Sequence, residues 1–309
     1  MPTQSISHRK EIMTMTKKYK EYVLLDSGYC KKLEQVGEYR IIRPALNAFW
    51  KPSLPEAEWL KADAVFERES SGGGVWTWSK KHHPQRDAEW AVSWGGVNLC
   101  IKPTSFGHLG FFAEQARNWV WLRQCIEKMN PHPQTLNLFA YSGGATIAMA
   151  QAGADVCHLD ASKGIIEWAK KNQELNPETN QHIRWICDDA MKFVAREKRR
   201  GHRYNGIVLD PPSFGRGAQG QVWKIEDGLA ELLDSCKSIL DLEHPFFILL
   251  SCHSQGFSAT SLGRILAEVF PAHRAEVDAG EMLIPEAEDR FLPAGLYARI
   301  FFVPGKKTL

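Results

Sequence analysis

The sequence predicts an α/β protein, in which a mostly parallel β-sheet forms the larger, carboxy-terminal part and a small β-rich module precedes it. Two observations lead to this fold class. After Gln134, short apolar runs alternate with longer segments of helical periodicity, which is the pattern of β-α units that build a parallel sheet. Before residue 105, the runs are short, aromatic and β-branched, and turn residues separate them, as in a module made of strands.

The first 104 residues divide into a tail and this module. Residues 1–20 are polar and mainly basic, and we expect a flexible tail. Residues 21–104 are predicted to form a small antiparallel module with tryptophans in its core. Basic residues accompany its aromatic residues, which suggests RNA binding; they include Lys31, Lys32, Arg40, Arg43, Lys80, Lys81, His82, His83 and Arg86. The strand-like runs are YVLLDSGY, GEYRIIRPA, ADAVFERE, GVWTWSKK and AEWAVSWGGVNLCIKP.

Residues 105–309 are predicted to form the α/β domain. A helical pattern over residues 108–129 ends before Pro131 and Pro133, which cannot continue a helix. Five apolar runs then read as strands, each followed by a helical pattern: TLNLFAY, ADVCHLDA, IRWICDDA, YNGIVLDPP and PFFILLSCHS. The last 25 or so residues add one or two strands. Right-handed crossovers between such strands place their carboxyl ends along one edge, where ligands bind.

Composition narrows the class of protein further. The formal charge of +2 neither requires nor excludes a nucleic-acid partner, and no run is apolar and long enough to cross a membrane. Seven cysteines are scattered without a C-x-x-C pair, so we expect neither disulfides nor a metal site. The absence of a signal-like amino terminus and the unpaired cysteines favour the cytoplasm.

The first strand of the α/β domain ends in Tyr141-Ser142-Gly143-Gly144. Two glycines allow positive φ and a close approach to a ligand, and the helix that follows offers unsatisfied N–H groups. The three spaced glycines of a dinucleotide-binding loop are missing. By itself, this loop favours a plain tight turn between the strand and the helix.

Acidic residues end the next two strands. Asp160 lies 17 residues after Gly143, close to the spacing of about 20 residues at which a carboxylate meets ribose hydroxyls. Asp188 and Asp189 end the third strand, where a carboxylate would be able to accept a hydrogen bond from an adenine amino group. In both places the alternative is a cap of the next helix, which after the second strand is either Asp160 or Ser162.

The fourth strand ends in LDPPSFGRG. Pro211 and Pro212 stiffen the turn after Asp210. The ring of Phe214 is suited to stacking on a base, and Arg216 to meeting a phosphate. The alternative is a rigid loop with a surface arginine.

Four segments together, NLFAYSGGA, HLDAS, CDDAMKF and VLDPPSFGRG, resemble the motifs of class I S-adenosylmethionine-dependent methyltransferases. They resemble more closely those of the bacterial group that methylates large-subunit ribosomal RNA, some members of which make 5-methylcytosine. The motifs span about residues 105–255. The resemblance implies a Rossmann-like domain with a mostly parallel, seven-stranded sheet.

By this resemblance, S-adenosyl-L-methionine is the cofactor. The loop from Phe139 to Gly144 holds its methionine part, Asp160 its ribose, and Asp189 or Asp188 its adenine amino group. The segment GFFAEQ resembles the one that approaches the cofactor before the first strand. The implied cofactor-binding residues are Phe112, Glu114, Gln115, Phe139, Tyr141, Ser142, Gly143, Gly144, Asp160, Ser162, Asp188, Asp189, Ala190 and Asp210. The implied catalytic residues are Asp210, Pro211, Pro212, Ser213, Phe214 and Cys252.

Cys252 lies at the end of the fifth strand, where the cytosine-5 members carry a nucleophilic cysteine. Such a thiolate adds to C6 of cytosine and thereby activates C5. His253 beside it would lower the pKa of the thiol. The alternative is that Cys252 only packs at the strand end.

We therefore expect a methyltransferase that acts on a base in ribosomal RNA, with cytosine C5 as the favoured atom. The alternatives are methylation of a guanine or adenine nitrogen, methylation of a protein or small molecule by the same core, and a non-catalytic RNA-binding scaffold. An RNA partner is expected, and neither a membrane nor a metal ion.

Overall fold

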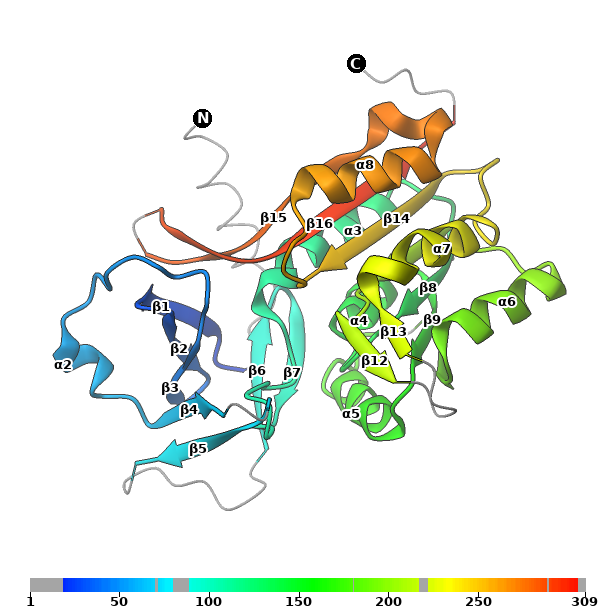
Figure 1. Cartoon of the computed structure of the whole chain (residues 1–309). Helices are drawn as coiled ribbons and strands as arrows, with labels where there is room; N and C mark the ends of the chain where they lie inside the picture. Colours follow the sequence, from blue (N-terminus) through cyan, green and yellow to red (C-terminus); the bar gives the residue numbers. More distant parts are fainter. Residues whose placement is uncertain are drawn as a thin grey trace. The chain divides into compact units, whose positions relative to one another are not determined.

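A seven-stranded sheet in the order β10-β9-β8-β11-β14-β16-β15 dominates the computed structural model (Figure 1). The structure describes residues 19–69, 72–79, 89–179, 181–216, 222–287 and 289–304. The chain divides into two compact units. The first comprises residues up to Arg117 together with Leu283–Ala294, and the second comprises Asn118–Met282 together with the chain from Gly295 onward.

The strands of the large sheet follow the predicted runs. They are β8 (Gln134–Leu138), β9 (Asp155–Asp160), β10 (Ile183–Cys187), β11 (Gly206–Leu209), β14 (Phe246–Cys252), β15 (Asp278–Pro285) and β16 (Phe291–Phe302). Strands β10, β9, β8, β11 and β14 pair in parallel, whereas β16 pairs antiparallel to β14. The predicted Rossmann-like α/β fold with a mostly parallel seven-stranded sheet is confirmed.

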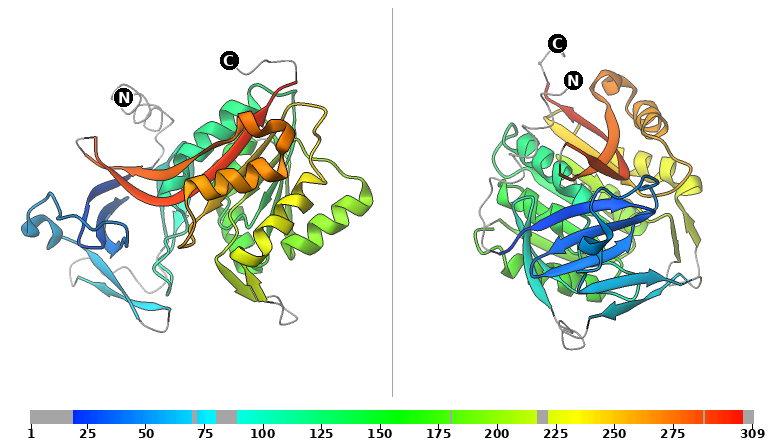
Figure 2. Two further views of the ribbon diagram at one scale, coloured as in Figure 1. Left: turned by 45° about the horizontal axis from the view of Figure 1, so that its top comes forward. Right: turned by 90° about the vertical axis from the view of Figure 1, so that its left-hand side faces the viewer.

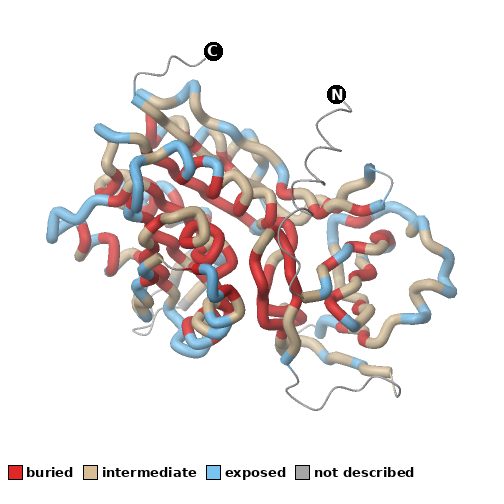
Figure 3. Tube along the Cα trace, turned by 180° about the vertical axis from the view of Figure 1, so that it is seen from behind, coloured by how far each residue is buried: buried red, intermediate tan, exposed pale blue. Residues whose placement is uncertain are grey.

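Helices cover both faces of this sheet because alternate side chains of each strand point to opposite faces. Ile207 and Leu209 belong to an apolar cluster with α6, α7 and α8, whereas Val208 between them packs with α3 and α4. Figure 2 shows the helices around the sheet, and Figure 3 shows buried residues along its strands. The helices are α3 (Ala116–Ile126), α4 (Gly144–Gln151), α5 (Lys163–Glu174), α6 (Ala190–Arg200), α7 (Ile225–Lys237) and α8 (Ala259–Val269).

Short elements complete this part of the chain. A hairpin of β12 (Phe214–Arg216) and β13 (Val222–Lys224) follows β11, and a 3₁₀ helix, η2 (Pro271–Glu276), follows α8. The order of the sheet reverses between β8 and β11, since β9 and β10 extend to one side and β14 to the other. Ligands of open α/β sheets bind beyond the carboxyl ends of the strands at such a point.

The first unit is rich in strands, as predicted. Its five-stranded sheet has the order β1-β2-β3-β4-β5, and β6 and β7 form a separate pair. Their bounds are β1 (Tyr22–Gly28), β2 (Lys31–Val36), β3 (Tyr39–Pro44), β4 (Ala64–Arg68), β5 (Gly74–Trp78), β6 (Trp90–Trp94) and β7 (Val97–Ile101), with α2 (Glu56–Trp59) and the 3₁₀ helix η1 (Ala113–Gln115).

The prediction of a purely antiparallel module is wrong at one place. Strands β3 and β4 pair in parallel, through Ile41 with Ala64 and Ile42 with Val65. The segment between them, which contains α2, is long enough to bring the chain back to the same end of the sheet, and parallel strands need such a crossover. The first compact unit includes η1, which is bonded to β6 from Trp94 Nε1 to the Ala113 carbonyl at 2.8 Å, and the domain boundary after residue 104 stays a prediction.

A buried ion pair holds part of the first unit together. The Glu34 carboxylate is fully buried and accepts hydrogen bonds from Arg43 at 2.7 and 2.8 Å and from the Tyr22 hydroxyl at 2.9 Å. Burial raises the pKa of Glu34, but the charges of Arg43 and Lys32 outweigh it and bring that pKa down to about 2. Lys32 and Arg43, which the sequence suggested for RNA, are therefore engaged in the interior.

The other basic residues suggested for RNA have different places. Arg40 pairs with Glu58 at 3.1 Å. The cluster at residues 80–86 and most of the predicted tail, residues 1–18, lie outside the described residues. Lys31 is exposed at the start of β2.

Candidate active site

The loop after β8 is held in an unusual backbone conformation. Phe139 and Tyr141 have φ of 55° and 49°, and Gly143 has φ of 85°. A residue with a Cβ at positive φ costs about 1–2 kcal/mol, and such strain is characteristic of functional sites. Glycine is favoured at Gly143, the N-cap of α4, because it avoids this strain and because a Cβ there would lie 3.2 Å from the Cβ of Ala169.

Hydrogen bonds from neighbouring elements fix this loop. The backbone N–H of Tyr141 donates to Asp160 Oδ2 at 3.0 Å, and the side-chain amide of Asn172 donates to the Ser142 carbonyl at 2.8 Å. A Cβ on Gly144 would meet Trp119 at 2.4 Å, so the start of α4 lies directly against α3. The loop is thus pre-organised by β9, α5 and α3.

A buried polar network lies beneath the loop. Thr146 Oγ1 accepts a hydrogen bond from Asn137 Nδ2 at 2.9 Å and lies 2.9 Å from His158 Nδ1. Burial lowers the pKa of His158 to about 3, so this imidazole is neutral. Sequence reasoning missed these three residues, although asparagine and histidine within otherwise apolar strands were a signal that a buried network was present.

Asp160 has the geometry expected of a carboxylate that receives a diol. One oxygen accepts the backbone N–H of Tyr141 at 3.0 Å and the other accepts that of Ser162 at 2.9 Å, and a carboxylate has about four acceptor positions in all. Burial raises the pKa of Asp160, partly offset by these N–H groups. Ser162 is the N-cap residue of α5, but its side chain makes no capping hydrogen bond.

The two acidic residues after β10 have different partners. Asp189 caps α6, accepting a hydrogen bond from the Lys192 N–H at 2.9 Å, while Ala190 is the first, buried residue of that helix. Asp188 pairs with Arg196 at 2.5 Å. The predicted cap is therefore present at Asp189, whose carboxylate retains acceptor sites for a further donor.

Polar side chains connect the ends of β11 and β14. Asp210 Oδ1 lies 3.2 Å from His253 Nδ1, and the Ser254 hydroxyl donates to Ser213 Oγ at 2.6 Å. A Cβ atom added to Gly295 of β16 would lie 3.0 Å from the His253 ring. The imidazole is therefore confined between the Asp210 carboxylate and the backbone of β16.

The D-P-P-S-F turn is braced by a residue that the sequence did not reveal. Trp223 of β13 donates its indole N–H to the Pro212 carbonyl at 2.8 Å. The same indole lies near the ring of Phe139, with centroids 6.3 Å apart. Phe214 follows the turn with 52% of its surface exposed, while Pro211 is buried. Trp223 thus connects the D-P-P-S-F turn to the loop after β8.

Cys252 is fully buried in the apolar cluster between the sheet and helices α6–α8. Burial raises the pKa of this thiol, and hydrogen bonds with Ser254, together with the nearby His253, offset the rise only in part. At neutral pH the thiol is protonated. These are the surroundings of a packing cysteine.

Phe112, Glu114 and Gln115 lie in the first unit, at η1. Glu114 is buried and Phe112 is half-buried. Their approach to the cofactor stays a prediction.

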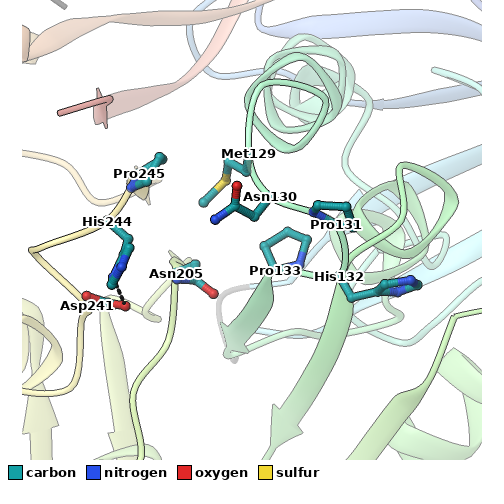
Figure 4. Close-up of a pocket in the computed structure, with 9 residues that line it drawn as sticks. All are labelled: Met129, Asn130, Pro131, His132, Pro133, Asn205, Asp241, His244 and Pro245. Carbon is teal, nitrogen blue, oxygen red and sulfur yellow. Dashed lines mark hydrogen bonds and ion pairs between the residues drawn. The ribbon is translucent and has the colours of Figure 1, made fainter. Parts of the chain in front are cut away.

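A separate pocket of about 250 Å³ lies at the amino-terminal ends of the parallel strands, at the edge of the large sheet opposite to their carboxyl ends (Figure 4). Pro133, Asn205 and Pro245, which line it, directly precede β8, β11 and β14. His244 bonds to Asp241 at 2.9 Å in its wall. It is therefore distinct from the site at the carboxyl ends of the strands.

Comparison with known proteins agrees with this geometry. Residues 88–242 match the model of the S-adenosylmethionine-dependent methyltransferase family, and the chain belongs to this family. The chain resembles a solved SAM-dependent methyltransferase from Agrobacterium tumefaciens with 38% identity and a TM-score of 0.83, over 93% of this chain and 92% of that one. It is an S-adenosylmethionine-dependent methyltransferase.

Two curated relatives are similar over part of their length. The ribosomal RNA large subunit methyltransferase I of Aeromonas salmonicida is 29% identical over 50% of this chain and 36% of its own. The ribosomal RNA large subunit methyltransferase K/L of Ectopseudomonas mendocina is 33% identical over 46% of this chain and 19% of its own. The matched regions thus span about a third and a fifth of the lengths of these relatives.

The residues present fit S-adenosylmethionine. The Asp160 carboxylate, which accepts backbone N–H groups of Tyr141 and Ser162, is suited to ribose hydroxyls, and the loop from Phe139 to Gly144 lacks the three spaced glycines of a dinucleotide-binding loop. Among the described residues, no group of three or more His, Cys, Asp and Glu side chains is placed to hold a metal ion. No helix in the described ranges has the length and apolar character needed to cross a membrane.

Proposed function

We propose that this enzyme methylates a nitrogen atom of a base in ribosomal RNA. The observation that carries the proposal is the turn after β11, in which the exposed Phe214 ring follows the Asp210 carboxylate. Such a turn is suited to stacking on an unpaired base while accepting a hydrogen bond from its amine. The names of the relatives from A. salmonicida and E. mendocina support ribosomal RNA as the substrate, and hence the cytoplasm as the place of action.

The chain's own residues would act mainly by positioning. The cofactor supplies a methyl group on a sulfonium. Asp210 would accept the N–H of the acceptor nitrogen and take up the proton that this nitrogen loses when its new bond to carbon forms. His253, at 3.2 Å from Asp210 Oδ1, would hold the carboxylate in place. Trp223 and Pro212 would keep the turn rigid through their 2.8 Å hydrogen bond.

Cytosine C5 methylation through Cys252 is the second candidate. The place of Cys252 at the end of β14, directly before His253, supports it. The complete burial of the thiol and its raised pKa favour the nitrogen instead, because an attacking thiolate must form and reach the base.

Labelled S-adenosylmethionine and ribosomal RNA from cells that lack this gene would test both candidates, with mass spectrometry of the product nucleosides. Under our proposal, the product is a base methylated on nitrogen. Asp210→Ala abolishes transfer, and Cys252→Ala behaves like the matched control Cys236→Ala, which alters another fully buried cysteine.

Other results would change the assignment. If 5-methylcytosine forms and Cys252→Ala alone prevents it, the covalent mechanism replaces the one proposed. If the cofactor binds while no RNA is labelled, RNA is not the substrate, and proteins and small molecules become the candidates.

A further inference from the structure

Aromatic side chains are exposed where two segments of the first unit meet. Tyr29 lies at the tip of the β1–β2 hairpin, and Phe49 and Trp50 lie in the segment after β3. Their exposed fractions are 64%, 80% and 38%. Figure 3 shows that the segment between β3 and β4 is exposed along much of its length. We call Tyr29, Phe49 and Trp50 the aromatic platform.

The platform is fixed by hydrogen bonds. The N–H of Tyr29 donates to the Trp50 carbonyl at 2.8 Å, and the N–H of Cys30 donates to the Ala48 carbonyl at 2.7 Å. The indole N–H of Trp50 donates to the Ser27 carbonyl at 2.9 Å. These bonds join the hairpin tip to the segment after β3, so the rings are presented from a pre-organised backbone. Rigid aromatic groups lose little conformational entropy on binding.

The residues of the aromatic platform contribute little to the stability of the fold, and one of them strains the backbone. Tyr29 and Cys30 have φ of 50° and 59° at a two-residue turn, where asparagine and glycine are the usual residues. A tyrosine there adds backbone strain, and its exposed ring gains little from burial. Strain combined with exposed aromatic surface indicates selection for binding rather than for stability.

Positive charge flanks the platform. Lys31 directly follows the two-residue turn, and Lys51 directly follows Trp50. Both lysines are exposed. Neither makes an ion pair with any carboxylate in the described ranges. Aromatic rings that stack on bases, combined with lysines that meet phosphates, are the usual means of binding single-stranded nucleic acid.

We propose that the aromatic platform of the first unit binds unpaired nucleotides of the RNA substrate, through residues other than those assigned to methyl transfer. This inference rests on the proposed function, since it takes RNA as the substrate. The platform contributes binding, and the residues at the strand ends of the second unit carry out the reaction.

The test is fluorescence anisotropy with full-length protein and a labelled single-stranded RNA of about 12 nucleotides, compared with the same strand in a duplex. We expect the single strand to bind more tightly. Phe49→Ala and Tyr29→Gly should each weaken that binding about tenfold, the order expected for the loss of one base–aromatic stack. Val75→Ala is the matched control, since Val75 is 53% exposed on β5, at the far edge of the same sheet.

Tyr29→Gly separates binding from folding. It removes the ring and relieves the positive φ, so its melting temperature should equal or exceed that of the wild type while RNA binding falls. The proposal is overturned if Tyr29→Gly and Phe49→Ala bind the single strand as tightly as Val75→Ala. It is also overturned if Phe49→Ala abolishes self-association in sedimentation without weakening RNA binding, because the platform would then be a protein interface.

Methyl transfer to ribosomal RNA, measured with the same preparations, distinguishes the two proposals. If the wild type methylates ribosomal RNA and the platform variants keep its KM, the platform proposal fails and the proposed function stands. If the wild type binds the single strand through the platform but methylates no RNA, the proposed function fails.

Discussion

Replacing Asp160 by asparagine should weaken cofactor binding while preserving the shape of the side chain. In the structure, one carboxylate oxygen accepts the Tyr141 N–H at 3.0 Å and the other accepts the Ser162 N–H at 2.9 Å. An asparagine has one oxygen, so its NH₂ group must face one of these donors. In the complex, the neutral amide also leaves a ribose hydroxyl without its carboxylate acceptor, a loss of about 1–3 kcal/mol, and 1.4 kcal/mol corresponds to a factor of about ten in affinity.

Isothermal titration calorimetry with S-adenosylhomocysteine should therefore show a Kd for Asp160→Asn raised about 5- to 150-fold. Asp155→Asn is the control, because Asp155 lies at the opposite end of β9 and bonds to Gln134. A Kd for Asp160→Asn within about twofold of that of the control would refute the role assigned to this carboxylate.

The pH dependence of binding offers a second check on Asp160. Burial raises the pKa of this carboxyl. Because the ionised form is the better acceptor for hydroxyl groups, affinity should fall as the pH drops through that raised pKa. The fall should begin at a higher pH than it would for an ordinary aspartate, and Asp160→Asn should abolish this part of the profile.

Three further substitutions test other parts of the structure. Glu34→Gln should destabilise the first unit by about 3–5 kcal/mol, since it leaves Arg43 buried without a countercharge; urea unfolding measures this. In the wild type, the contribution of Glu34 is present above its unfolded pKa and is lost as the pH falls toward the folded value of about 2. Phe214→Ala should reduce kcat/KM for RNA by a factor corresponding to about 1–3 kcal/mol and leave cofactor affinity unchanged in calorimetry. Gly144→Ala should lower the melting temperature, because a Cβ there meets Trp119 at 2.4 Å.

Much of the fold and part of the site follow from local sequence. Hydrophobic runs of strand length, alternating with helical patterns, determine a parallel sheet, because only a crossover connection returns the chain in the same direction. In such a sheet the residues that follow each strand lie at one edge. Gly143, Asp160, Asp189 and Asp210 were therefore recognisable as neighbours in space, although they are far apart in the chain.

Other features were decided only by tertiary structure. The approach of His253 to Asp210 depends on the register between β11 and β14, and the bond from Trp223 to Pro212 depends on how the β12–β13 hairpin folds back. The burial of Cys252 depends on helices packed over its strand. No local pattern encodes these contacts, because each is set by segments that meet only after the sheet and its helices have packed together.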